Sequence, residues 1–143
     1  MKTLAIIPAR GGSKRIPRKN VLEVGGKALI VHTVHQAQNS DHINRVVVST
    51  DDDEIADVSQ RAGAEVLIRP AALSNGTATS ESALIHALDE LADTHNYVPD
   101  ELVFLQCTSP LRRPTDIDDA IDRFRTMQLD SLFSVSRFRK YVW

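Results

Sequence analysis

The stretch LAIIPARGGSKRIPRKN, residues 4–20, decides the fold. Its first four residues form a short apolar run, which is typical of a strand buried on both faces of a sheet. Pro8 ends this run, and a loop rich in glycine and basic residues follows as far as Asn20. Glycine lets a backbone approach a phosphate group closely, and arginine and lysine supply the opposite charge. The stretch therefore predicts a buried strand that leads directly into an anion-binding loop.

The rest of the chain repeats an alternation of strand and helix signals. Short apolar runs predict further strands at residues 45–49, 65–68, 102–105 and 132–135. Apolar residues at helical spacing predict helices that contain residues 27–39, 55–62, 84–91 and 114–124. Such alternation predicts an α/β fold, a Rossmann-like three-layer sandwich with a mostly parallel sheet. Ligands of such sheets lie beyond the carboxyl ends of the strands.

The length and composition limit the number of domains and the kinds of partner that this chain is expected to have. The 143 residues are enough for one domain with a single core, and the net charge of −2 favours neither nucleic acid nor an anionic membrane as partner. No stretch approaches the length of a membrane span. Cys107 is the single cysteine, so an intrachain disulfide is excluded and a cytoplasmic location is expected. We expect one nucleotide-binding domain over residues 1–143.

The C-terminal end is unusual because two aromatic residues, Tyr141 and Trp143, close the chain with no helix after the last apolar run. Aromatic side chains normally pack against other parts of a protein. We therefore expect a domain that is truncated at its C-terminus.

The basic loop matches neither of two common phosphate motifs. A Walker loop needs Gly-x-x-x-x-Gly-Lys-Ser/Thr and a dinucleotide fingerprint needs Gly-x-Gly-x-x-Gly, and both spacings are absent. The loop nevertheless places five cations within ten residues, namely Arg10, Lys14, Arg15, Arg18 and Lys19. A local anion site is the favoured interpretation, and a solvated basic surface loop is the alternative.

Acidic residues at two predicted helix starts fit capping. Thr50 with Asp53, and Thr115 with Asp118, have the spacing of a capping box. The acidic run at residues 51–53 is therefore predicted to cap a helix rather than to bind a metal ion. Cys107 is predicted to be a packed residue and not a nucleophile.

Residues 7–20, IPARGGSKRIPRKN, closely resemble the signature of the acylneuraminate cytidylyltransferases, the CMP-sialic acid synthetases. Later segments match the family in the same order, at residues 48–52, 69–73, 77–80 and 105–112. The resemblance covers essentially the whole chain and implies a fold of the nucleotide-diphospho-sugar transferase type. One departure is Asn75-Gly76, where the family usually has an aspartate before its Thr-Ala-Thr-Ser segment.

Two sister groups resemble the chain less well by motif. The KDO cytidylyltransferases carry Arg-Leu-Pro-Gly-Lys-Pro where this chain has Arg-Ile-Pro-Arg-Lys-Asn at residues 15–20, and they place an aspartate after the fourth strand. Pseudaminic-acid enzymes resemble Ala-Thr-Ala-Pro where this chain has Cys-Thr-Ser-Pro at residues 107–110. These differences favour the acylneuraminate group.

The resemblance implies a reaction in which CMP passes from CTP to a nonulosonic, sialic-type acid with release of pyrophosphate. It implies catalytic roles for Arg10 and Lys19 and nucleotide contacts for Ala9, Arg10, Gly11, Gly12, Ser13, Lys14, Asn20, Arg69, Thr79 and Ser80. Gln106, Thr108 and Ser109 are expected on the sugar side. Mg²⁺ is the expected cofactor, with ligands beyond residue 143, and the full-length protein is expected to form a homodimer.

Several alternatives stay open on the sequence. The chain could be a CTP-binding remnant without catalysis, or part of a synthetase for legionaminic acid, pseudaminic acid or KDO. Arg69 could be an ordinary surface-loop residue. Thr79 and Ser80 lie at a predicted helix start, where capping alone would explain them.

Overall fold

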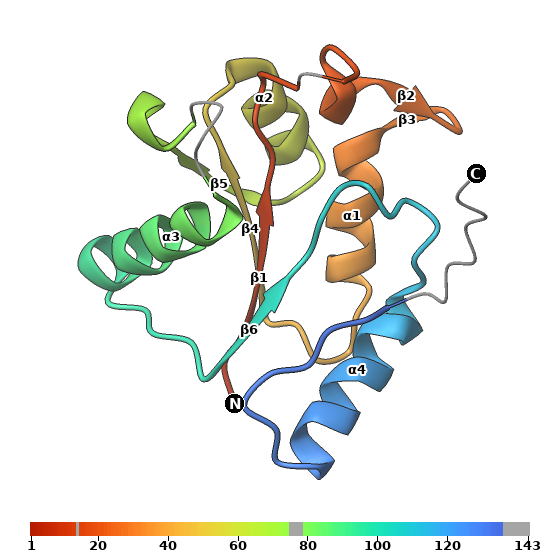
Figure 1. Cartoon of the computed structure of the whole chain (residues 1–143), viewed down its shortest axis with the longest axis vertical. Coiled ribbons are helices and arrows are strands. Elements are labelled where there is room, and N and C mark those ends of the chain that lie inside the picture. The colour runs from red at the N-terminus through yellow and green to blue at the C-terminus, as the bar shows by residue number, and fades with distance from the viewer. Residues whose placement is uncertain (14, 75–78, 136–143) are drawn as a thin grey trace, which may run out of the picture.

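The computed structural model of the chain describes residues 1–13, 15–74 and 79–135. Its central sheet consists of four parallel strands, β1 (Thr3–Pro8), β4 (Arg45–Thr50), β5 (Glu65–Ile68) and β6 (Glu101–Phe104) (Figure 1). Their order across the sheet is β5-β4-β1-β6, which places β1 in the middle. Leu4 of β1 lies opposite Arg45 of β4 on one side and Leu102 of β6 on the other.

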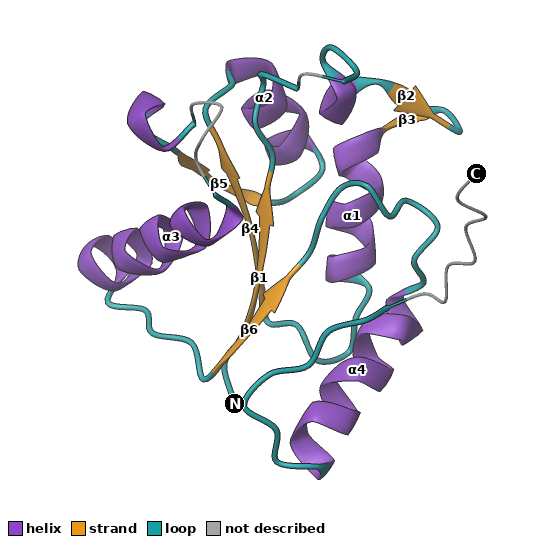
Figure 2. Cartoon of the chain, viewed as in Figure 1, coloured by secondary structure: helices purple, strands orange, loops and turns teal. Residues whose placement is uncertain are grey.

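Helices cover both faces of this sheet (Figure 2). They are α1 (Leu29–Gln38), α2 (Asp53–Arg61), α3 (Ser80–His95) and α4 (Pro114–Thr126). Alternate side chains of β1 point to opposite faces: Ala5 and Ile7 pack in the core with α1, α2 and α4, whereas Leu4 and Ile6 pack against α3. The predicted three-layer α/β sandwich with a parallel sheet is confirmed.

A small hairpin precedes α1 and shortens the helix expected at residues 27–39. Strands β2 (Glu23–Val24) and β3 (Lys27–Ala28) pair antiparallel across Gly25 and Gly26. Both glycines have positive φ angles, 59° and 80°, as a two-residue hairpin turn requires. The single-turn helices η1 (Lys19–Val21) and η2 (Ala71–Leu73) lie in the loops after β1 and β5.

The strand expected at residues 132–135 does not form, so that prediction is wrong. Phe133 and Val135 are 83% and 82% exposed and belong to no strand. A strand needs a neighbour that accepts its backbone hydrogen bonds and covers its apolar side chains. The described part of the chain provides neither for these residues.

The two predicted capping boxes are also wrong in register. Asp52 is the N-cap of α2, where its Oδ1 accepts a hydrogen bond from the Ile55 N–H at 2.9 Å. Thr50 cannot cap this helix because it is still the last residue of β4. In α4, Pro114 is the first helical residue, so Arg113 is the N-cap and its N–H donates to the Asp116 carboxylate at 2.9 Å.

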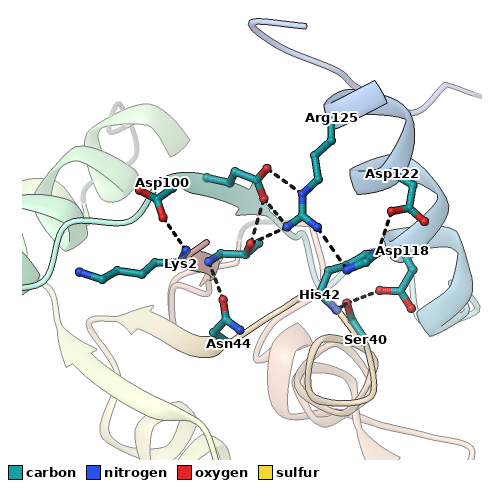
Figure 3. Close-up of polar contacts among 10 residues, drawn as sticks. Lys2, Ser40, His42, Asn44, Asp100, Asp118, Asp122 and Arg125 are labelled. Carbon is teal, nitrogen blue, oxygen red and sulfur yellow. Dashed lines mark hydrogen bonds and ion pairs between the residues drawn. The ribbon is translucent and has the colours of Figure 1, made fainter. Parts of the chain in front are cut away.

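A polar network closes the amino ends of the strands, and we call Thr3, His42, Glu101 and Arg125 the amino-end cluster. Arg125 donates to Glu101 from Nε at 2.9 Å and from Nη2 at 2.8 Å. Thr3 Oγ1 donates to Glu101 at 2.9 Å and accepts from Arg125 at 3.0 Å. His42 lies between Arg125 and Asp122 (Figure 3). The network fastens α4 to the start of β1 and β6.

Within the described ranges, no helix combines the length and the apolar character needed to cross a membrane.

Candidate functional site

The strand order defines where a ligand site is expected. The chain runs from β1 outward through β4 to β5 and then returns to place β6 on the other side of β1. In open parallel sheets, ligands bind outside the carboxyl ends of the strands at the point where the order reverses. That point lies between β1 and β6, so the segments after these two strands line the candidate site.

Backbone hydrogen bonds continue the sheet one residue past the strand ends. The Ala9 N–H donates to the Ser49 carbonyl at 2.9 Å, and the Leu105 N–H donates to the Ile6 carbonyl at 3.1 Å. The Arg69 N–H donates to the Thr50 carbonyl at 2.6 Å. The predicted site segments after β1, β5 and β6 therefore start from one edge of the sheet.

Residues 9–20, which we call the glycine loop, are held at several described positions by a hydrogen bond within the loop and by contacts with the start of α2. The buried Asn20 donates from Nδ2 to the Arg10 carbonyl at 3.1 Å. The Gly11 N–H donates to Asp51 Oδ1 at 3.0 Å. Arg18 forms ion pairs with Asp52 and Glu54. The loop is thus held near both of its ends.

Arg18 differs from the other cations of the basic cluster. Its guanidinium makes a two-pronged contact with Asp52 and a further contact with Glu54, and these hydrogen bonds raise its pKa. The same contact with Arg18 lowers the pKa of Asp52. Arg18 therefore stabilises the loop, and it is not among the cations that we expect to bind an anion.

Arg69 is buried at the carboxyl ends of β4 and β5, with 6% of its surface exposed. Its Nη2 donates to the Ser49 carbonyl at 3.3 Å, and its Nε is buried without a hydrogen-bond partner among the described residues. Burial lowers the pKa of Arg69, Asp51 opposes this change, and Arg10 adds to it. The charges of Asp51 and Arg10 thus act on Arg69, which is not an ordinary surface residue.

The segment after β6 brings the second group of predicted residues to the same edge. Gln106, Thr108 and Ser109 are exposed there, as side chains that contact a substrate must be. Arg112 holds the backbone of this segment, because it donates to the Gln106 carbonyl at 3.3 Å and to the Gln36 side chain at 3.3 Å.

Cys107 lies between these exposed residues but is itself only 4% exposed. Burial raises the pKa of the Cys107 thiol to about 11, while the nearby charges of Lys19 and Arg112 partly oppose the change. The prediction that Cys107 is packed is confirmed.

Some predicted residues are not brought into this group. Thr79 is the N-cap of α3, where its Oγ1 accepts from the Ser82 N–H at 3.2 Å, and both Thr79 and Ser80 are exposed. Gly12 is exposed, and Ser13 contacts the Gly11 carbonyl through its N–H at 3.0 Å. Lys14 and Asn75-Gly76 lie outside the described residues. A nucleotide role for Gly12, Ser13, Lys14, Thr79 and Ser80 stays a prediction.

Three residues that shape the site are not among those predicted from the sequence, namely Asp51, Asp52 and Arg112. Asp51 and Asp52 were assigned to helix capping alone, yet both contact the glycine loop. Their position directly after a parallel strand, beside the strand that carries the loop, was the available signal.

Magnesium finds no ready-made set of ligands in this part of the protein. Among residues 1–13, 15–74 and 79–135, no group of three His, Cys, Asp or Glu side chains is arranged to hold a metal ion. Asp51 and Asp52 are the carboxylates beside the glycine loop, and both already accept hydrogen bonds from it. The described residues therefore do not fit a complete Mg²⁺ site.

A parallel α/β sandwich with a cationic glycine loop at its switch point is the arrangement of a nucleotide-binding domain. Comparison with protein families makes the class specific. The cytidylyltransferase family model matches residues 4–141, and the chain belongs to this family.

Curated relatives agree with this membership. The chain is 39% identical over 139 residues to a pseudaminic acid cytidylyltransferase of Campylobacter jejuni, which covers 96% of this chain and 60% of the relative. It is 36% identical over 143 residues to an N-acylneuraminate cytidylyltransferase of Streptococcus agalactiae, which covers 99% of this chain and 33% of the relative. The chain therefore spans well under two thirds of the length of these relatives.

Solved structures support the fold. The chain superimposes with a TM-score of 0.74 and 27% identity on CMP:2-keto-3-deoxy-manno-octonic acid synthetase complexed with CTP, over 88% of this chain and 48% of that one. The resemblance to cytidylyltransferases is confirmed. The motif differences favour the acylneuraminate group, whereas overall identity is 39% to the pseudaminic acid relative and 36% to the N-acylneuraminate relative.

Proposed function

We propose that this chain forms the nucleotide-binding part of a cytidylyltransferase that transfers CMP from CTP to a nonulosonic acid of the sialic type and releases pyrophosphate. The observation that carries the proposal is the position of the glycine loop. It follows β1 at the switch point of the sheet, and the buried Arg69, whose Nε has no hydrogen-bond partner among the described residues, follows β5 at the same end of the sheet. Family membership and the solved relative with bound CTP support the choice of nucleotide.

In the proposed reaction, the anomeric hydroxyl of the sugar acid attacks the α-phosphorus of CTP and pyrophosphate leaves. The negative charge on the leaving group must be neutralised, and fixed cations do this without reorganisation during the reaction. Arg10 suits two phosphate oxygens because a guanidinium donates in a fork, and Lys14 and Lys19 suit single oxygens. The glycine backbone at residues 11–12 allows the triphosphate to approach closely.

The remaining predicted residues divide between the two substrates. Asn20, Arg69, Thr79 and Ser80 are assigned to the nucleotide, and Gln106, Thr108 and Ser109 are assigned to the sugar acid. The exposed amide and hydroxyl groups after β6 can exchange hydrogen bonds with substrate hydroxyl and amide groups. Their position across the switch point from the glycine loop favours this division.

The proposal also includes features of the whole protein. Mg²⁺ would accompany CTP and balance phosphate charge, with ligands supplied outside the described residues. A homodimer and a cytoplasmic location complete the proposal, the latter supported by the single cysteine. Legionaminic acid, pseudaminic acid and KDO are the alternative acceptors, and the pseudaminic relative supports including them.

Pyrophosphate release by the full-length protein tests the function. The protein is incubated with CTP, Mg²⁺ and, in separate reactions, N-acetylneuraminate and each alternative acid. Release with one acid identifies the acceptor, whereas CTP binding without release under any condition supports a non-catalytic remnant. Absence of CTP binding contradicts the proposal as a whole.

Arg10→Ala tests the site assignment. We expect a loss of about 2–3 kcal/mol in CTP binding or in transition-state stabilisation, the scale of a lost hydrogen bond to a charged group. Arg123→Ala, which removes an exposed arginine of α4, is the matched control and should keep the kinetics of the unaltered protein. If Arg10→Ala also keeps them, Arg10 does not bind the phosphates.

A further inference from the structure

Two carboxylates that the nucleotide need not touch hold the glycine loop in place. We infer that Asp51 and Asp52 are positioning residues, which act through Gly11 and Arg18 to keep the loop in a shape that receives CTP. This inference rests on the proposed function. We call Asp51 and Asp52 the carboxylate clamp.

Asp52 makes three contacts at once. It caps α2 through the Ile55 N–H at 2.9 Å, and its two oxygens pair with the guanidinium of Arg18, one of them at 3.0 Å from Nη2. Its side chain is only 17% exposed. One carboxylate therefore fixes the start of α2 and the distal part of the loop to each other.

Gly11 packs against the same carboxylate. A Cβ atom at this position would lie 2.5 Å from Asp52 Oδ2, closer than real Cβ contacts, and 3.0 Å from Asp52 Cβ, which is already a tight contact. At the same time, the Gly11 N–H donates to Asp51 Oδ1 at 3.0 Å. The loop backbone can approach the clamp this closely only because residue 11 is glycine.

Arg18 is held in an unusual backbone conformation. Its φ of 56° lies in the left-handed region, which residues other than glycine seldom adopt. Such a conformation persists where surrounding contacts fix it, and the ion pairs with Asp52 and Glu54 are contacts of that kind. Lys19 and Asn20 follow directly, so the direction of the chain at Arg18 sets their place in the site.

The carboxylate clamp lowers the conformational entropy that the glycine loop has to lose when CTP binds. A loop that is already fixed at residues 11 and 18 loses less conformational freedom when a ligand arrives than a free loop does. Arg10 and Lys19, the predicted catalytic pair, are the direct neighbours of these two fixed points. The clamp therefore positions residues that it does not touch.

Variants of the full-length protein distinguish the loop-positioning role of Asp52 from its role as the N-cap of α2. Asp52→Ser keeps a good N-cap for α2 but removes the partner of Arg18. Arg18→Met removes the pair from the other side and leaves the cap intact. Arg61→Met is the matched control, because it breaks an exposed ion pair with Asp57 elsewhere on α2.

The measurements are the Kd for CTP, and hydrogen exchange of the loop amides without ligand. We expect Asp52→Ser and Arg18→Met each to weaken CTP binding about tenfold. The double variant should bind little more weakly than Arg18→Met, because both substitutions break the Asp52–Arg18 pair and Arg18→Met already removes the pair with Glu54. Loop exchange should rise in both variants and stay unchanged in Arg61→Met. Unaltered CTP binding in both variants overturns the inference.

Two further results have distinct meanings. Weaker CTP binding without faster loop exchange would show that these side chains contact the nucleotide themselves, which also overturns a positioning role. If the unaltered protein does not bind CTP, the proposed function fails, yet loop exchange still decides whether Asp52 and Arg18 fix the loop. The failure of one proposal is thus distinguishable from the failure of the other.

Discussion

An arginine lies at each end of the central sheet, and the two arginines differ in burial and in their partners. At the amino ends of the strands, Arg125 meets the carboxylate of Glu101 with two donors and Thr3 with a third contact. At the carboxyl ends, Arg69 is more deeply buried but contacts backbone carbonyls at 3.3 and 3.5 Å, and its Nε has no partner within the described part of the chain.

This difference suggests that Arg125 stabilises the fold, whereas Arg69 is available to bind a ligand. A buried ion pair in good geometry holds two elements together, and the loss of one partner leaves an uncompensated charge. A buried cation whose nearest contacts are neutral carbonyls has attraction left over for an anionic ligand. The amino-end cluster is thus expected to govern stability, and Arg69 is expected to govern nucleotide affinity.

Arg125→Met should have the largest effect. We expect the free energy of unfolding to fall by about 3 kcal/mol, because the Glu101 side chain, 9% exposed, keeps its charge and loses its charged partner, with only the Thr3 hydroxyl still donating to it. Chemical denaturation of the full-length protein measures this loss. CTP affinity, measured on the folded variant, should stay unchanged.

A double variant tests whether the unpaired charge of Glu101, and not a general disruption of packing, causes the loss of stability. In Arg125→Met combined with Glu101→Met, no charge is left unpaired, so most of the lost stability should return. A double variant that is less stable than Arg125→Met would show that the amino-end cluster does not fasten the fold in this way.

Arg69→Met should have the next largest effect, and on binding rather than on stability. We expect CTP affinity to fall by about 2 kcal/mol, the value of a charge-assisted contact. Stability should be kept or slightly raised, because the change removes a buried guanidinium whose pKa burial already lowers. Calorimetric titration with CTP and chemical denaturation measure the two quantities.

Arg69→Lys sharpens this result, because it keeps the charge but not the planar fork of donors. An intermediate affinity is expected. If Arg69→Met instead unfolds the protein and binds CTP normally when folded, then Arg69 is a structural support for Ser49 and Leu73, and the proposed contrast between the edges is wrong.

The layers of the fold could be predicted from the sequence because they follow from local patterns. The apolar run at residues 4–7 marks a strand buried on both faces, and the structure has both faces covered. The run at residues 132–135 carries the same kind of signal but forms no strand. Apolar character alone cannot supply a hydrogen-bonding neighbour, which is a property of the whole sheet.

The site could be predicted only in part. The glycine loop is contiguous in sequence, so its cations and glycines are visible as one motif. Asp52 and Arg18 are 34 residues apart, and their pairing depends on β1 and β4 being neighbours. The sequence also overstates the number of loop cations that are free to bind an anion, because it does not show that Arg18 pairs with carboxylates at the start of α2.

Lowering the pH should produce the smallest of the expected effects on the free energy of unfolding, and this effect should still differ between the amino and carboxyl ends of the strands. Arg125 holds the pKa of Glu101 below its usual range, with Thr3 adding to this and burial opposing it. A carboxyl group whose pKa is lowered by folding stabilises the protein above its unfolded pKa of about 4.3, and this contribution disappears as the pH falls through the folded value. The free energy of unfolding should therefore decline in acid, by less than in Arg125→Met because a protonated Glu101 still accepts hydrogen bonds.

Glu101→Gln isolates this contribution, because the amide has similar shape and no charge to lose. Its free energy of unfolding should fall less steeply than that of the unaltered protein between about pH 6 and pH 3. Asp52→Asn at the carboxyl edge removes another carboxyl group with a lowered pKa, but its partner Arg18 is 41% exposed, against 26% for Arg125. Solvent screens the more exposed pair, so Asp52→Asn should flatten the acid slope less than Glu101→Gln does. An equal or greater flattening in Asp52→Asn would mean that the carboxyl edge also fastens the fold.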